Sequence, residues 1–253
     1  MMFDREKFAK LCAEDGAGEI CADSIGLYKE KRLHRILKRL VCENPDAHEF
    51  KIGNYVADVF ETGRITEIQT GSFYPLHRKL TYYLAKTDYE VRLVHPVIAE
   101  KRIIRIDKES GEVIRSRRSP KRVGMGEIMR EIFRIAELVK NERLEIVILY
   151  ISADEYRYSE AVRYRRSGKY DSELLPREIL SEERFCGVES YKFLLDGTPE
   201  RFLAKEYGTL KKLHGRELYS TLNLLTALGL LEREKGERGA YEYRCTDNSE
   251  NGI

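Results

Sequence analysis

Hydrophobic and polar residues alternate in two short runs within residues 53–71, and this pattern predicts a β-hairpin. The first predicted strand covers residues 55–60 and the second covers residues 64–70, with Glu-Thr-Gly as the turn between them. Gly63 suits this turn because glycine adopts a positive φ angle without steric cost. We expect the rest of the chain to be built around this hairpin.

Helical periodicity is clearest in residues 24–41, where apolar residues recur at helical spacing and Pro45 follows the predicted end. The apolar stripe consists of Ile25, Leu33, Ile36, Leu37 and Leu40. A second helix is predicted for residues 72–86, with Pro75 in its first turn. Further helices are predicted within residues 1–24 and over about residues 124–139.

Apolar runs predict one strand over residues 89–97, with Pro96 at its end, and another over residues 144–153. Between them, residues 101–117 predict a second hairpin with Gly111 in its turn. Strands and helices thus alternate through residue 153, which is the order expected when helices cover a partly parallel sheet. The pattern predicts an α/β fold with a mixed central sheet flanked by helices.

The tail of the chain has a different pattern. Its predicted elements are helices over residues 176–183, 198–207 and 216–228, followed by a hairpin whose turn covers residues 235–239. Gly208 is expected to end the second of these helices. Because helix, helix and hairpin of this length resemble a winged helix-turn-helix, we predict two domains, residues 1–175 and residues 176–253.

The chain is rich in charge but nearly neutral, with 35% charged residues and a net charge of +2. A nucleic-acid site would therefore depend on local basic clusters rather than on overall charge. No apolar run is long enough to span a membrane, and the N-terminus lacks the apolar core of a signal peptide. Five cysteines are scattered without a CxxC pair, so neither a zinc ribbon nor a disulfide framework is expected. We expect a cytoplasmic protein that has no membrane partner.

Acidic residues in the first hairpin carry the most specific candidate chemistry. Asp58 lies within an otherwise apolar strand, and it can lie beside Glu67 on the next strand. Facing carboxylates repel each other, and a divalent metal ion between them would remove the repulsion. The alternative is that Asp58 and Glu67 both have a structural role. Glu30, His34 and Lys38 share a stripe of the helix before the hairpin, a spacing that a solvated charge ladder would also give.

Asp58, followed after eight residues by Glu67-Ile68-Gln69, resembles the motif of the PD-(D/E)XK nuclease superfamily, which has the restriction-endonuclease-like fold. The usual motif ends in Glu-x-Lys, and Glu-x-Gln is a variant found in a minority of members. The segments EKRLHRILKRL, FYPLHRKLTYYL and RSPKR, at residues 30–40, 73–84 and 118–122, resemble a prokaryotic family with this core and a winged-helix-like tail. The resemblance covers roughly residues 26–244.

This resemblance implies hydrolysis of DNA phosphodiester bonds with Mg²⁺ or Mn²⁺ as the cofactor. The metal ligands that it implies are Glu30, Asp58, Glu67 and the carbonyl of Ile68. Gln69 replaces the lysine that usually orients the attacking water, and its amide would position that water by hydrogen bonding. Lys38 or Lys79 would supply the missing cation, and His34 would carry a proton near neutral pH.

Basic clusters are candidates for phosphate contacts, which hold a nucleic acid without reading its sequence. Residues 115–122 contain five basic residues and no acidic one, namely Arg115, Arg117, Arg118, Lys121 and Arg122. Residues 156–170 are predicted to form a basic connector, in which tyrosines are interleaved with Arg163, Arg165 and Arg166. The tyrosines could stack on bases or pack in a core. Lys211, Lys212 and Arg216 lie at the start of the predicted recognition helix. Solvated surface charge is the alternative for each cluster, and a protein-interaction role is the alternative for the winged helix.

Taken with the resemblance, these features favour a Mg²⁺-dependent DNA endonuclease, and many such nucleases act as homodimers. Because Gln69 replaces the usual lysine, a catalytically weak or inactive nuclease fold that binds nucleic acid as a regulator is the alternative. A protein-interaction scaffold is the third hypothesis, and it predicts no salt-dependent affinity for DNA.

Overall fold

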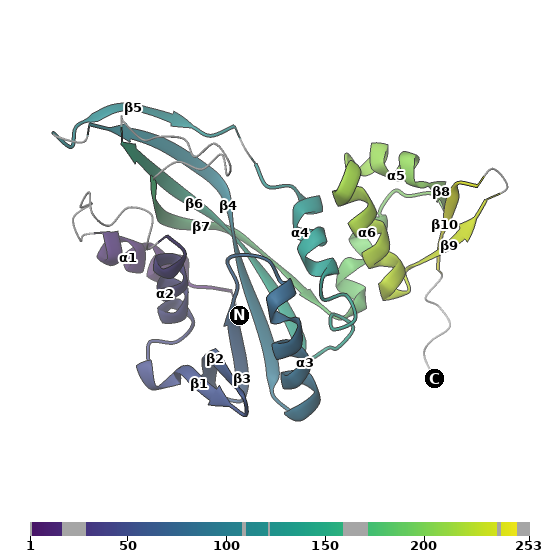
Figure 1. Cartoon of the computed structure of the whole chain (residues 1–253), viewed down its shortest axis with the longest axis horizontal. Coiled ribbons are helices and arrows are strands. Elements are labelled where there is room, and N and C mark those ends of the chain that lie inside the picture. The colour runs from purple at the N-terminus through teal and green to yellow at the C-terminus, as the bar shows by residue number, and fades with distance from the viewer. Residues whose placement is uncertain are drawn as a thin grey trace. The chain divides into compact units, whose positions relative to one another are not determined.

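The fold is α/β, with a mixed multi-strand sheet flanked by helices, as the sequence predicts (Figure 1). The computed structural model describes residues 2–16, 29–107, 110–120, 122–158, 172–236 and 239–246, and the structural statements that follow concern these residues. Within α2, the side chains of residues 29–31 are also outside the description.

The large sheet has the strand order β1-β2-β3-β4-β6-β7, and β5 pairs with β4. Its strands are β1 (His48–Ile52), β2 (Tyr55–Glu61), β3 (Arg64–Ile68), β4 (Glu90–Ile106), β5 (Val113–Arg118), β6 (Leu144–Tyr158) and β7 (Ser172–Cys186). Strands β1, β2 and β3 form an antiparallel meander. Strands β3 and β4 are neighbours joined through a helix, which is the connection that parallel strands require.

The predicted hairpin is confirmed as β2 and β3. Its ladder pairs Val59 with Thr66 and Phe60 with Ile65, so the strands are antiparallel and in register. Both Thr62 and Gly63 have positive φ angles, 49° and 77°, as a tight two-residue hairpin turn requires. Strand β1, which the sequence pattern did not predict, adds a third strand at the edge next to β2.

Helices α1 (Arg5–Gly16) and α2 (Lys29–Val41) pack together with the large sheet. The predicted apolar stripe of α2 is buried from Leu33 to Leu40, where it shares one core with residues of α1, β3, β4, β6 and β7. Each such buried aliphatic side chain stabilises the fold by about 1.5–3 kcal/mol. Burial of this stripe leaves the flank that carries His34 and Lys38 only partly exposed, and it directs these residues to β2.

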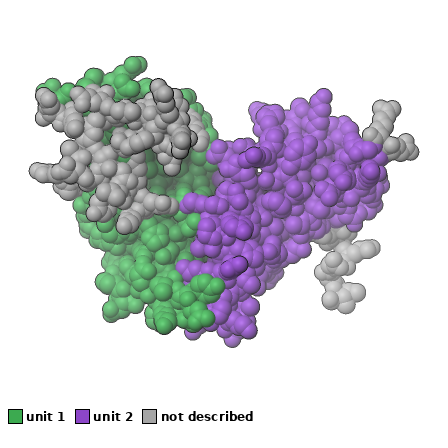
Figure 2. Space-filling view, in the orientation of Figure 1, with its two compact units in different colours: residues 1–70, 92–123, 147–183 green, residues 71–91, 124–146, 184–253 purple. Residues whose placement is uncertain are grey.

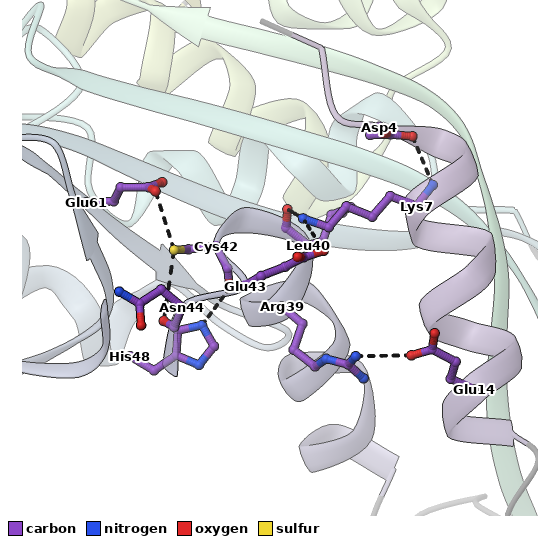
Figure 3. A network of polar contacts seen from close by, with 10 residues as sticks. All are labelled: Asp4, Lys7, Glu14, Arg39, Leu40, Cys42, Glu43, Asn44, His48 and Glu61. Atoms are coloured by element: carbon purple, nitrogen blue, oxygen red, sulfur yellow. Dashed lines mark hydrogen bonds and ion pairs between the residues drawn. The ribbon is translucent and has the colours of Figure 1, made fainter. Parts of the chain in front are cut away.

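A polar network holds the C-terminal end of α2 in place (Figure 3). Lys7 of α1 donates to the carbonyl of Leu40 at 3.3 Å, and Arg39 pairs with Glu14 of α1 at 3.0 Å. The Cys42 thiol donates to Glu61 of β2, and the His48 ring lies 2.8 Å from the Cys42 carbonyl. Contacts with both α1 and the meander thereby fix the position of α2, from which His34 and Lys38 contact Asp58.

The chain folds into two compact units (Figure 2). Unit 1 contains residues 1–70, 92–123 and 147–183, and unit 2 contains residues 71–91, 124–146 and 184–253. The helices of unit 2 are η3 (Tyr74–Leu76), α3 (His77–Lys86), α4 (Met125–Phe133), η4 (Val188–Leu195), α5 (Ala204–Lys211) and α6 (Gly215–Leu228). Its small sheet has the order β8-β10-β9, from β8 (Arg201–Leu203), β9 (Leu231–Lys235) and β10 (Tyr241–Cys245). The division into two domains, residues 1–175 and residues 176–253, stays a prediction.

Helix α4 packs closely on α6 within unit 2. A Cβ atom added to Gly126 would lie 2.8 Å from the Cβ of Glu217 and 2.7 Å from Cδ2 of Leu213. The absence of a side chain at Gly126 is therefore what allows the two segments to approach. One face of the predicted recognition helix is covered by α4.

Several predicted elements were wrong in type or extent. Residues 176–183 form part of strand β7 and not a helix, and Pro176 is tolerated because β7 lies at the sheet edge. Strand β4 continues well beyond Pro96 to Ile106, and α4 ends at Phe133.

The predicted helix over residues 198–207 was also wrong. Residues 201–203 form β8, and α5 continues past Gly208 to Lys211. Gly208 does not end the helix; a Cβ there would lie 2.9 Å from the carbonyl oxygen of Leu213, so glycine permits close packing at this point.

Candidate functional site

Asp58 lies where α2 meets the meander, and three donors converge on its carboxylate. His34 Nε2 lies 3.0 Å from Oδ2, and the main-chain N–H of Ile68 donates to the same oxygen at 2.8 Å. Lys38 Nζ lies 3.7 Å from Oδ1 and also pairs with Glu49 of β1. The structure thus brings together four of the residues predicted for the catalytic and metal sites, namely His34, Lys38, Asp58 and Ile68.

The pKa of Asp58 reflects opposing influences. Burial alone would raise it, but the hydrogen bond and charge of His34, the N–H of Ile68 and the charge of Lys38 together lower the pKa below its ordinary value. A lowered pKa keeps the carboxylate ionised at neutral pH. An ionised carboxylate is the form that binds a divalent cation.

Glu67 lies on β3, the strand paired with that of Asp58, and Gln69 follows the end of β3. Continued by one pair beyond Val59 and Thr66, the register would place Asp58 opposite Glu67, whose residue is only 2% exposed. The main chain of Gln69 is held from β4, because its N–H donates to the Val94 carbonyl at 2.9 Å and its carbonyl lies 2.5 Å from His95 Nδ1. These contacts hold the main chain just beyond the end of β3.

Two other predicted catalytic residues, Glu30 and Lys79, have no described contact with Asp58. The side chain of Glu30 lies outside the described residues, although its backbone begins α2. Lys79 belongs to α3 of unit 2, where its ammonium lies 6.0 Å from the ring centroid of Tyr83. Within the described part of the chain, no three His, Cys, Asp or Glu side chains form a metal-binding group.

The basic segment predicted at residues 115–122 is divided by the β4–β5 hairpin into two faces. Arg115 and Arg117 of β5 lie on one face with Arg105 of β4, because Arg105 pairs with Arg115 and Ile103 pairs with Arg117. With Arg157 of β6 they line a cavity of about 220 Å³, which we call the arginine pocket: Ile103, Arg105, Arg115, Arg117 and Arg157.

The opposite face of this hairpin has mixed charge. Arg102 donates two hydrogen bonds to Asp154, at 2.9 and 2.8 Å, and Arg177 pairs with the same carboxylate at 3.3 Å. Arg118 and Arg122 line a neighbouring cavity of about 270 Å³ together with these groups. Adjacent arginines of β5 therefore face surroundings of different charge.

The remaining predicted nucleic-acid residues fall in two groups. Lys121, Arg163, Arg165 and Arg166 lie outside the described residues. In unit 2, Lys211 donates to the carbonyl of Asp196 at 2.7 Å, Lys212 has a left-handed conformation after α5, and Arg216 is exposed in the first turn of α6.

Most residues of this site lie in a segment of the chain that matches one protein family. Residues 31–186 match the family described as "Domain of unknown function (DUF8091)". The chain belongs to this family. A relative from Treponema pallidum (strain Nichols), described as "Uncharacterized protein", is 31% identical over 184 residues, which is 71% of each chain. No solved structure matches the chain.

The DUF8091 segment includes Asp58, its partners on α2 and the arginine pocket, and it ends before α5 and α6. No helix in the described part of this DUF8091 protein is long and apolar enough to cross a membrane. The resemblance to PD-(D/E)XK nucleases, the cytoplasmic location and a homodimer stay predictions.

Sequence patterns missed several residues that adjoin the site. Glu49 and His95 contact Lys38 and Gln69, respectively, from strands that are distant in the sequence. Arg105 and Arg157 join the arginine pocket because of strand pairing in the DUF8091 fold. Basic residues alternate with other residues in the second predicted hairpin. This alternation was the one sequence signal that could have placed Arg105 on the same face as other arginines.

Proposed function

We propose that this protein is a metal-dependent nuclease that hydrolyses DNA phosphodiester bonds, with a restriction-endonuclease-like core and a winged helix-turn-helix. The observation that carries the proposal is the carboxylate of Asp58, which accepts a hydrogen bond from the main-chain N–H of Ile68 at 2.8 Å and lies on the strand paired with that of Glu67. Asp58 and Glu67 thus lie on paired strands, Gln69 follows the second of them, and α2 contributes His34 and Lys38.

Chemically, the donor set fits a divalent cation. Mg²⁺ binds through one or two protein carboxylates and keeps water and substrate phosphate as its other ligands. Asp58 and Glu67 provide two carboxylates on facing strands, with the Ile68 carbonyl and Glu30 as further predicted ligands. When bound, such an ion polarises the phosphate and lowers the pKa of a water molecule.

The side chains around Asp58 can perform the other tasks of hydrolysis. Lys38 places a positive charge 3.7 Å from the carboxylate, where it can stabilise the negative charge that develops on a phosphate. The His34 ring, 3.0 Å from Asp58, can accept or donate a proton during the reaction. The Gln69 side-chain amide can hold a water molecule by hydrogen bonding, and the fixed main chain of Gln69 limits its range of positions.

Unit 2 supports the winged-helix part of the proposal. Helices α5 and α6 are followed by the β9–β10 hairpin, and β8 completes a small three-stranded sheet. Arg216 and Tyr219 are exposed on α6, on a helix that also packs on α4. A nucleic acid contacting this helix would meet its exposed side.

A second candidate function is nucleic-acid binding without cleavage. It is favoured by the three donors that already contact Asp58, since His34 and Lys38 occupy positions from which they would compete with a metal ion. The arginine pocket would still contact phosphate in such a protein.

Plasmid cleavage in Mg²⁺ or Mn²⁺, with EDTA as a control, tests the proposal. We expect nicking or linearisation that Asp58→Asn and Glu67→Gln each reduce by at least about 100-fold, as expected for loss of a group that stabilises the transition state. Asp88→Asn is the matched control, because Asp88 is exposed in the loop after α3. Salt-sensitive DNA binding without metal-dependent cleavage would instead support the second candidate, and absence of both would reject both candidates.

A further inference from the structure

We propose that the arginine pocket binds the terminal phosphate monoester of a nucleic acid. The proposal rests on the proposed function only in taking nucleic acid as the ligand, and it requires no cleavage. The pocket is lined by residues of the β4–β5 hairpin and β6, within unit 1. Figure 1 shows these three strands. The pocket contains Arg105 and Arg157, which no sequence pattern assigned to a phosphate site.

Strand pairing places positive charges directly opposite each other in this pocket. Arg105 of β4 pairs with Arg115 of β5, and Arg117 lies one alternation further along the same face. Like charges directly opposite in an antiparallel pair are destabilising. A bound anion would remove this repulsion, so the pocket has a reason to bind one.

Acidic groups in the described part of the chain do not neutralise the pocket. Its lining, as far as the structure describes it, contains four arginines and one isoleucine and no carboxylate. Glu155 contacts Arg157 at 3.1 Å, but the same carboxylate is shared with Lys101 at 2.6 Å and with the Ser172 hydroxyl at 2.8 Å. Arg105, Arg115 and Arg117 therefore supply the charge for a ligand.

The size and charge of the pocket favour a terminal phosphate. Its volume of about 220 Å³ is well above what a single water molecule needs, and it admits a phosphate group and its nearest ester. A monoester carries a charge of about −1.5 to −2 at pH 7 and offers three acceptor oxygens to guanidinium groups. A phosphodiester within a nucleic-acid chain carries one negative charge and has two substituents, so it would make fewer hydrogen bonds with the arginines of the pocket.

Arg118 provides a matched control within the same strand. Arg117 and Arg118 are adjacent and exposed, but Arg118 lines the opposite cavity, whose lining also includes Asp154 and Glu178. Substitution of either residue by glutamine removes one charge from β5. Only Arg117→Gln changes the arginine pocket.

The test is fluorescence anisotropy with a single-stranded oligonucleotide in three forms, carrying a 5′-phosphate, a 3′-phosphate or no terminal phosphate, in EDTA to prevent cleavage. We expect one phosphorylated end to bind about tenfold more tightly than the unphosphorylated form, the size expected for added charge-assisted hydrogen bonds. Arg117→Gln should remove this preference, and Arg118→Gln should keep it. Pyrophosphate, as a competitor, should reduce the preference in the wild-type protein.

Equal affinity of the wild-type protein for all three forms would overturn the proposal. So would an equal loss of the preference in both variants, because that result would show a general effect of charge. If no form bound, while pyrophosphate bound in calorimetry and required Arg117, the nucleic-acid proposal would be rejected and the phosphate pocket upheld. Because this assay measures binding in EDTA, its result does not depend on whether the protein cleaves DNA.

Discussion

His34 Nε2 lies 3.0 Å from Asp58 Oδ2, and this contact joins α2 to the second strand of the meander. The two residues are separated by 24 positions, so the contact depends on the placement of the whole helix on the sheet. Burial of the apolar stripe of α2 and the polar network at its C-terminal end provide that placement. The geometry of the candidate site is thus a consequence of core packing.

We expect His34→Gln to raise the pKa of Asp58. Burial favours the protonated carboxyl, and the hydrogen bond and charge of His34 are the strongest influences in the opposite direction. Titration of the Asp58 carboxyl carbon by NMR would measure the shift. His214→Gln is the control, since His214 is exposed in unit 2. An unchanged Asp58 pKa in His34→Gln would contradict the geometry described for this pair.

In unit 2, we expect Gly126→Ala to destabilise the protein by about 1–3 kcal/mol, because its new Cβ would lie 2.8 Å from the Cβ of Glu217. Urea unfolding followed by circular dichroism would measure the change. Gly124→Ala is a close control: its φ is −93° and no atom lies within 4 Å of the added Cβ. That control should lower the free energy of unfolding by less than Gly126→Ala does, by under about 1 kcal/mol, because alanine is a poorer N-cap than the glycine at this position. Similar effects of the two substitutions would argue against the close approach of α4 and α6.

Local sequence patterns were sufficient to predict several elements. The turn before Arg64 was correctly assigned, because glycine and alternating apolar residues on both sides define a hairpin without distant contacts. Helix α6 was also predicted closely, and Gly229 ends it with a φ of 78°, as its position after the last apolar residue indicated. These features depend on neighbouring residues, so they can be read from the chain.

Features that depend on distant pairing could not be read in this way. Pro176 suggested a helix start, but an edge position in the sheet, which only the strand order reveals, makes Pro176 compatible with β7. The pairing of Arg105 with Arg115 likewise requires the register of β4 and β5, and Arg157 comes from another strand. The pairing of the strands that carry Asp58 and Glu67 could be predicted from spacing, whereas the contact of Asp58 with Lys38 required the packed helix.

We expect Mg²⁺ or Mn²⁺ to raise the melting temperature through Asp58. At a metal concentration about ten times the dissociation constant, binding to the folded state adds ~1.4 kcal/mol, or a rise of a few degrees for a chain of this size. Asp58→Asn should remove the rise, and Arg117→Gln, which changes only the arginine pocket, should keep it. Differential scanning fluorimetry with and without EDTA measures this effect. A rise of equal size in Asp58→Asn would place the metal elsewhere.

Glu155 should make the stability of unit 1 depend on pH. Burial alone would raise the pKa of this carboxyl, but hydrogen bonds from Arg157, Lys101 and Ser172 lower it from 4.5 to about 2. Because the folded-state pKa lies below the unfolded value, the ionised carboxylate stabilises the fold above pH 4.5, and this contribution is lost as the pH falls toward 2. A shift of this size corresponds to ~3 kcal/mol at neutral pH.

Glu155→Gln removes the charge while nearly keeping the shape of the side chain, so it isolates this electrostatic contribution. We expect the variant to unfold at lower urea than the wild-type protein at pH 7, and we expect the difference to narrow between pH 4.5 and pH 3. Glu112→Gln, a change of the same kind at an exposed position beside the β4–β5 turn, should alter the free energy of unfolding by less than about 0.5 kcal/mol. A difference between Glu155→Gln and the wild type that stays constant with pH would show that Glu155 acts through packing and not through its charge.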